Sequence, residues 1–232
     1  MKQIRLLSIS FNTEIKPYEI PAFRGAIIEK VGMEHEFYHN HDNNDDSKQN
    51  YHYRYPLVQY KQSGKQPMLV FVDKGVDAAQ HFFVQSNWNL TFAGKPHQME
   101  INEMHVKPYE IGVIDYEKKY SLTKWIALNE KNFQRYMALD NLIDKVKLLE
   151  EVLVGHILSF AAGVGHRYAE RIEVSIIEIY KRRYLPYEGI KILTFNISFK
   201  CNVQLPPFIG LGKGVSQGFG TLKHYHKPKD QI

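Results

Sequence analysis

Near the C-terminus, residues 193–203 of the segment 190–203 alternate apolar and polar side chains without a break. Because a period of two puts successive side chains on opposite faces of a β-strand, this pattern predicts a long strand with one buried face. The other face is polar and available, as is common in antiparallel sheets. The apolar set consists of Leu193, Phe195, Ile197, Phe199, Cys201 and Val203. The chain therefore contains a sheet that must be covered on one side.

The residues before this strand predict a long helix, from about 129 to 162. Its apolar residues recur at steps of three and four, which places them in one stripe along the helix. The stripe consists of Leu139, Ile143, Val146, Leu149, Leu153, Ile157 and Phe160. Gly163 and Gly165 are expected to end the helix. A further strand is predicted at residues 172–180.

The first half of the chain predicts the same order of elements. We expect a strand at 7–11, a helix at 22–31, a hairpin from 55–61 and 68–73, a helix at 77–86, and strands at 90–92 and 99–106. Two successive βαββαβ-like units, each with helices on one face of an antiparallel sheet, indicate an α+β fold. The predicted fold is two tandem ferredoxin-like domains, residues 1–118 and 119–232. Only the order of elements repeats, because no repeat of sequence is visible.

The charge and the cysteine content of the chain narrow the range of partners and compartments. The 232 residues carry a formal net charge of +5, with an isoelectric point near 9.0. This basic excess favours an anionic partner such as nucleic acid, although many proteins without one share it. The single cysteine, Cys201, excludes an intramolecular disulfide and is typical of a reducing cytoplasm. The longest apolar stretch, 152–164, is too short to cross a bilayer, so we expect a cytoplasmic protein with no membrane partner.

Five glycines lie close together after the last long strand, between residues 210 and 220. Glycine permits positive φ and close approach of the backbone to a ligand, and successive N–H groups in such a loop form an anion-binding concavity. The Walker phosphate loop and the dinucleotide fingerprint both fail to match here. The residues alone leave two interpretations open, a turn between strands and a phosphate-binding loop. The candidate RNA contacts are Gly210, Gly212, Lys213, Gly214, Ser216, Gln217, Gly218 and Gly220.

A polar segment after the first predicted helix carries two histidines, His39 and His41. In an extended segment they point to the same side, and imidazole titrates near neutral pH. A neutral histidine can take the proton of a ribose 2′-OH while a protonated one gives a proton to the leaving 5′-oxygen. That pair suffices for metal-free RNA cleavage, which leaves a 2′,3′-cyclic phosphate and a 5′-OH end. Tyr38 is a candidate helper in this reaction.

Two other interpretations of the histidine segment stay open. Histidines in a polar loop are commonly plain solvated residues. A His-x-His pair followed by carboxylates can also hold a transition metal, and three such acids follow here. They are Asp42, Asp45 and Asp46.

Basic residues gather in the second half, and Arg182 and Arg183 form the densest group together with Lys181. A charge cluster is more often a solvated face than a site. Contacts to RNA phosphates need such charges, however, and make the affinity fall with salt. Beside the glycines, we interpret the two arginines as RNA contacts. Aromatic residues, 13% of the chain, offer stacking partners for unpaired bases.

The spacing of the glycines resembles that of a known superfamily. Gly210-Leu-Gly, five residues and Gly218-Phe-Gly220 match the C-terminal loop of the RAMP proteins, the RNA-binding proteins of CRISPR systems. Four further segments resemble one branch, the b-type CRISPR repeat-processing endoribonucleases. They are residues 55–61, 125–133, 155–165 and 202–212.

This resemblance implies two ferredoxin-like domains, an RNA-binding cleft and cleavage within CRISPR repeat RNA to give guide RNAs, without a cofactor or metal. It implies a catalytic histidine after the first helix, where we favour His41 over His39. Other CRISPR effector subunits and a second copy of the chain are candidate partners. The alternative is a non-catalytic guide-RNA-binding subunit of a CRISPR effector complex, because the glycine loop is shared by both kinds of protein.

Overall fold

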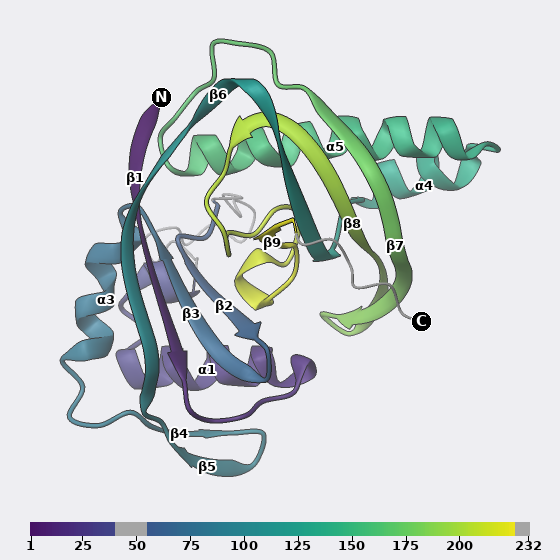
Figure 1. The fold of residues 1–232 in the computed structure, drawn as a ribbon. Helices are drawn as coiled ribbons and strands as arrows, with labels where there is room; N and C mark the ends of the chain where they lie inside the picture. Colours follow the sequence, from purple (N-terminus) through teal and green to yellow (C-terminus); the bar gives the residue numbers. More distant parts are fainter. Residues whose placement is uncertain (40–54, 226–232) are drawn as a thin grey trace, which may run out of the picture.

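The computed structural model describes residues 1–39 and 55–225, which form an α+β fold with antiparallel sheets (Figure 1). The elements of the first half, in chain order, are β1 (Lys2–Phe11), the 3₁₀ helix η1 (Pro17–Glu19), α1 (Ile20–Val31), α2 (Glu36–His39), β2 (Val58–Ser63), β3 (Gln66–Val72), α3 (Gly75–Phe83), β4 (Asn89–Phe92) and β5 (Lys95–Gln98). β4 and β5 form a small separate hairpin. The strands, the helices and the hairpin expected in this half are confirmed, most with ends shifted by a few residues, but the strand expected at 99–106 continues to Trp125.

The second half begins within one long strand. Its elements are β6 (Ile101–Trp125), α4 (Glu130–Ala138), α5 (Leu142–Gly163), β7 (Val174–Tyr187), β8 (Ile190–Gln204), the 3₁₀ helix η2 (Val215–Gln217) and β9 (Thr221–His224). The alternating strand predicted at 190–203 is confirmed as β8, and its apolar set is buried.

The long strand β6 joins the two halves. Its first part pairs with β1 up to Ile111, and its second part pairs with β8 from Gly112 onward. The main sheet therefore runs β2-β3-β1-β6-β8-β7, and β9 also pairs with β6. The boundary expected after residue 118 lies inside this strand, whereas the change of pairing partner falls between Ile111 and Gly112.

Each half arranges its strands in the same order. In the first half β1 lies between β3 and β6, and in the second half β6 lies between β8 and β9. All neighbouring strands in both sets are antiparallel. The connection between the third and fourth strands differs, because the first half has α3 there and the second half has residues 205–220, which include the glycines. We call residues 210–220 the glycine loop.

The predicted helix at 129–162 is in fact two helices. Asn141 begins α5, since its side-chain oxygen accepts the N–H of Asp144, and Leu139 before it has extended backbone angles. This cap interrupts a single helix. The predicted apolar stripe is wrong at Ile143, which is 69% exposed, and is confirmed at four buried residues further along the helix. These are Leu149, Leu153, Ile157 and Phe160.

Two hydrophobic cores stabilise the fold. The first lies between α1, α3 and one face of the first-half strands, around Phe23 and Phe82. The second lies around α5 and also takes in Leu6 and Val70 from the other face of the first-half strands. The two halves therefore share the second core. No helix among the described residues is long and apolar enough to cross a bilayer.

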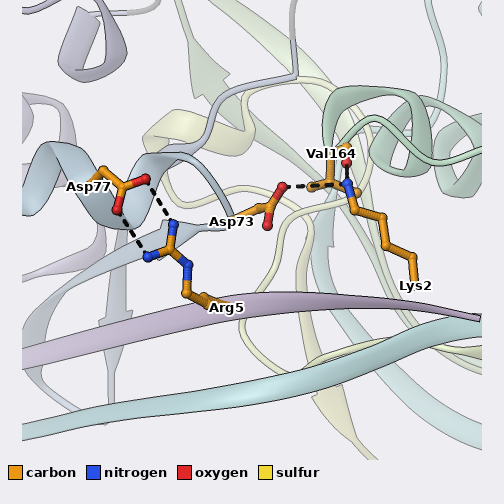
Figure 2. A network of polar contacts seen from close by, with 5 residues as sticks. All are labelled: Lys2, Arg5, Asp73, Asp77 and Val164. Atoms are coloured by element: carbon orange, nitrogen blue, oxygen red, sulfur yellow. Dashed lines mark hydrogen bonds and ion pairs between the residues drawn. The ribbon is translucent and has the colours of Figure 1, made fainter.

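Polar contacts fasten β1 to both halves (Figure 2). Arg5 donates two hydrogen bonds to the Asp77 carboxylate, at 3.0 and 2.8 Å, and so ties β1 to α3. Lys2 lies 3.6 Å from an Asp73 carboxylate oxygen and also donates to the Val164 carbonyl at the end of α5. Lys2 thus links the end of β3 to the C-terminus of α5, which belongs to the other half.

Candidate nucleic-acid interface

The glycine loop folds back on the strands that it joins. The Leu211 N–H donates to the Gly220 carbonyl at 2.9 Å, and the Gly220 N–H donates to the Lys124 carbonyl at 3.1 Å. A Cβ on Gly220 would lie 1.9 Å from the Leu211 carbonyl oxygen, and one on Gly212 would lie 2.6 Å from the Ile126 carbonyl oxygen. Glycine is required at both positions, since both also have positive φ.

Buried polar groups of the first half hold the glycine loop. The Tyr55 hydroxyl donates to the Gly210 carbonyl at 2.9 Å, and the Gly210 N–H donates to Gln59 Oε1 at 3.0 Å. The Gln59 amide also donates to the Tyr55 hydroxyl at 2.9 Å. Burial raises the pKa of Tyr55 far above its ordinary value, so the hydroxyl stays a donor at neutral pH. Gly218 packs against Ile20 of α1, which gives the loop a second contact with the first half.

Several loop N–H groups that the sequence offers for anion binding are instead used in hydrogen bonds within the protein. The N–H groups of Gly210, Leu211, Lys213 and Gly220 all donate to groups within the protein. The Lys213 side chain is exposed, with its ammonium 5.2 Å from the centre of the Tyr187 ring. The remaining candidates, Gly212, Gly214, Ser216 and Gln217, are half-buried, and Gly218 is buried. A role of these residues in holding RNA stays a prediction, and the side chains are better placed for it than the bonded amides.

The two neighbouring arginines of β7 face opposite sides of the sheet. Arg182 pairs with Phe195 of β8 and donates at 3.5 Å to the Tyr136 hydroxyl on the helical side. Arg183 pairs with Thr194 and helps to lower the pKa of Lys124, which places it near the cations beside the glycine loop. The structure therefore separates a pair that the sequence groups together.

A group of cations lies beside the glycine loop, and its member on β2 is on the face opposite α1. Lys61 of β2 is completely buried, and its ammonium lies 3.4 Å from the Thr221 hydroxyl. Burial, and then the charge of Lys124, lowers the pKa of Lys61 to about 7. Burial also lowers the pKa of Lys124, and the nearby charges of Arg183 and Lys223 lower it further. Four strands thus bring positive charge to one place.

The histidine segment begins in the short helix α2. His39 is 4% exposed, and its Nε2 lies 2.8 Å from the Met33 carbonyl. Arg24 donates to the His39 carbonyl at 2.7 Å. His39 therefore lies in a helix, and the extended conformation expected for it is wrong. His41 and the three nearby acids lie outside the described residues, so the pairing of His39 with His41 is untested.

Tyr38 is also held inside the protein. Its hydroxyl donates to the Ala78 carbonyl of α3 at 2.9 Å, and the side chain is 1% exposed. Burial raises the pKa of Tyr38 far above its ordinary value. The Tyr60 hydroxyl donates to the Tyr38 carbonyl at 3.1 Å, which ties α2 to β2. Tyr38 and His39 are thus both held by contacts inside the first half.

Two family models match the chain in tandem and cover nearly all of it. The Cas6b N-terminal domain matches residues 2–110, and the Cas6b C-terminal domain matches residues 112–225. The chain belongs to the Cas6b family. The two domain models meet where β6 changes its partner from β1 to β8, between Ile111 and Gly112.

Solved Cas6b structures have the same fold. A structure described as Cas6b is 26% identical, with a TM-score of 0.86, over 97% of this chain and 100% of the other. A second, described as the CRISPR RNA processing endoribonuclease Cas6b, is 23% identical with a TM-score of 0.72 over the same shares. An uncharacterized protein of Methanocaldococcus jannaschii is 35% identical over 134 residues, which are 57% of this chain and 90% of that protein.

Sequence reasoning about this Cas6b chain missed the polar side of β2. Gln59 and Lys61 alternate with Val58 and Tyr60, so a period of two places them on the side opposite α1. That alternation was a usable signal for a polar strand face. It did not show that the glycine loop buries this face, because the contact joins residues about 150 positions apart.

Proposed function

We propose that this chain is an endoribonuclease that cuts CRISPR repeat RNA to produce guide RNAs. The observation that carries the proposal is the tandem match to both Cas6b domain models along nearly the whole chain. A solved relative with the same fold is described as a CRISPR RNA processing endoribonuclease. The basic group beneath the glycine loop fits an RNA backbone, because phosphates are bound by such charges.

The proposed chemistry is attack of a ribose 2′-oxygen on the adjacent phosphorus. The 2′-OH loses its proton to a base, the bond from phosphorus to the 5′-oxygen breaks, and an acid protonates that oxygen. The products are a 2′,3′-cyclic phosphate and a 5′-OH end, and no metal or cofactor takes part. His41 is the better candidate for a reacting group. His39 and Tyr38 are buried, so we assign them the role of positioning the segment that carries His41.

The proposed architecture is two ferredoxin-like units that share β6. The strand order of each half supports this division, since the first strand of each lies between the third and the fourth. The change of partner at Ile111 and Gly112 supports a division near residue 111 rather than after residue 118. RNA then contacts both units, because the glycine loop of the second is bonded to β2 of the first.

The test of the activity uses the protein with CRISPR repeat RNA of its host in excess EDTA. We expect a single cut that leaves a cyclic phosphate and a 5′-OH end. A cut that appears only when Mg²⁺ or Mn²⁺ is restored would contradict the metal-free mechanism. His41→Ala should slow cutting about 100-fold or more. His97→Ala, in the β4–β5 hairpin, is the matched control and should cut at the normal rate.

A non-catalytic RNA-binding subunit is the second candidate function. The burial of Tyr38 and His39 favours it, because it removes two of three proposed catalytic side chains from solvent. Tight binding of repeat RNA without any product, at an excess of protein over RNA, would support this function. In that case partners such as other CRISPR effector subunits would have to supply the cutting activity.

A further inference from the structure

Lys61 is a buried cation with little to bind. Its side chain is 0% exposed, and the Thr221 hydroxyl, at 3.4 Å, is a weak and neutral acceptor. Among the described residues, the ion pairs formed include none with Lys61. Lysine is almost never fully buried unless it is paired, because desolvation of its charge costs several kcal/mol. The position therefore calls for an explanation beyond packing.

A second lysine, Lys124, lies near Lys61. Lys124 lies at an irregularity of β6, between Leu122 and Trp125, and has a φ of +50° that non-glycine residues seldom adopt. Its N–H donates to Asn196 Oδ1 at 2.7 Å, and its carbonyl accepts the Gly220 N–H. The backbone of Lys124 is thus fixed by β8 on one side and by the glycine loop on the other. The charge of Lys124 helps to lower the pKa of Lys61, which places the two side chains near each other although their charges repel.

The surroundings add further positive charge. Arg183 of β7 and Lys223 of β9 lie near Lys124 on the same side of the sheet. The hydrogen bonds around Lys61 and Lys124 among the described residues involve hydroxyls and an amide. Thr221 lies against the Lys61 ammonium, Thr123 donates to the Thr221 carbonyl, and Asn196 accepts the backbone N–H of Lys124. Buried charges of one sign destabilise a fold unless an opposite charge joins them, and such costs are typical of functional sites.

We propose that Lys61 and Lys124 bind one phosphate group of the RNA backbone at the base of the glycine loop, with the Thr221 hydroxyl as a third donor. This inference rests on the proposed function, since it assumes that RNA is the ligand. Ammonium groups only donate hydrogen bonds, so the ligand must be an acceptor with negative charge. A phosphodiester supplies two non-bridging oxygens and one charge. Because Lys61 comes from the first half and Lys124 from the second, the bound phosphate also joins the halves.

The test compares Lys61→Met, Lys124→Gln and the double variant with a control, Lys65→Gln, at the exposed end of the same β2–β3 hairpin. Binding is measured with repeat RNA made of 2′-O-methyl nucleotides, which 2′-oxygen attack cannot cut. Each single variant should weaken binding about tenfold, as expected for a charge-assisted contact. The slope of log affinity against log salt should fall by about 0.7, the value for one phosphate of a single strand. The double variant should lose little more than either single variant.

Unfolding temperatures without RNA separate a ligand site from a structural role. Lys61→Met should raise the unfolding temperature, because methionine fills the space without a buried charge. A lower unfolding temperature would show that the lysine serves the fold and would overturn the proposal. Normal RNA affinity and salt slope in both single variants would overturn it as well. Inorganic phosphate should raise the unfolding temperature of the unaltered protein more than that of Lys61→Met.

Failure of the proposed function gives a different result. If the unaltered protein neither binds nor cuts repeat RNA, the function itself is wrong. If it binds and cuts normally and only the lysine variants behave like the Lys65→Gln control, the phosphate site alone is wrong. Stabilisation of the unaltered protein by inorganic phosphate, combined with normal RNA binding by Lys61→Met, would show that free phosphate rather than RNA is the ligand.

Discussion

Between its third and fourth strands, the first half of this Cas6b chain carries helix α3, whereas the second half carries the glycine loop. Helix α3 buries Ala78, Ala79 and Phe82 in a closed apolar core and completes that side of the sheet. The glycine loop instead packs over the polar face of β2, where Gln59 and Lys61 are fully buried, and three further strands bring cations beside it. The same strand order therefore encloses a buried cation, Lys61, where a loop replaces the helix, and the cations around it are half-buried or exposed.

Replacement of Lys61 should change the free energy of unfolding more than any other substitution proposed below. Folded Lys61 has a pKa of about 7, below its ordinary 10.5, so the unfolded chain binds the proton more readily. The resulting penalty is complete below pH 7 and disappears as the pH rises toward 10.5. Lys61→Met should therefore raise the free energy of unfolding by up to about 4 kcal/mol at pH 6 and by little near pH 10.

Urea unfolding of both proteins between pH 6 and 10 measures this difference, and groups that titrate alike in both proteins cancel. Within the part of the chain that the structure describes, the charged groups that act on this site are Lys124, Arg183 and Lys223, all cations. A difference that is constant with pH would show that Lys61 is uncharged or paired throughout the range. The basic face would then be an ordinary protein surface like that of the first half.

The second prediction tests whether the loop is as rigid as the helix. In Gly220→Ala the new Cβ meets the Leu211 carbonyl oxygen at 1.9 Å, and φ is already +59°. We expect the free energy of unfolding to fall by about 3 kcal/mol, from strain and a displaced backbone. Gly94→Ala in the β4–β5 turn is the matched control. It has a positive φ but no atom within 4 Å, so it should cost only about 1 kcal/mol. Equal losses, measured by urea unfolding, would mean that the loop is not closely packed.

The third prediction concerns the bond between the halves. Tyr55→Phe removes the hydroxyl that donates to the Gly210 carbonyl and accepts from Gln59. Two buried polar groups lose a partner, so the free energy of unfolding should fall by about 1 to 2 kcal/mol. RNA affinity should fall as well, because the loop is less firmly held over β2. Tyr18→Phe, at an exposed ring, is the control and should change neither value. A loss of stability with unchanged RNA affinity would separate the loop's position from binding.

Many strands and helices of both halves could be predicted from the sequence, but the long-range contacts that create the site could not. The alternation in residues 190–203 predicted β8 and its buried face, and the glycine spacing indicated the loop and the family. Local patterns act over a few residues, so they could not show that β6 continues through both halves. They also could not show that Lys61 meets Thr221, 160 positions away. The Asn141 cap was a readable signal for the break before α5, yet the apolar stripe dominated the prediction.

The smallest expected change in RNA binding distinguishes the two sides of β7. Arg183 lies on the side of the Lys61–Lys124 cations, and Arg182 contacts Tyr136 on the side of the helices. Arg183→Gln should weaken RNA binding about threefold to fivefold and lower the salt slope by about 0.7, as expected for one exposed phosphate contact. Arg182→Gln is the matched control, with the same change one residue away, and should leave both values unaltered. If Arg182→Gln gives the larger loss, RNA lies on the helical side of the second half, and the loop beside the cations is only a connection between strands.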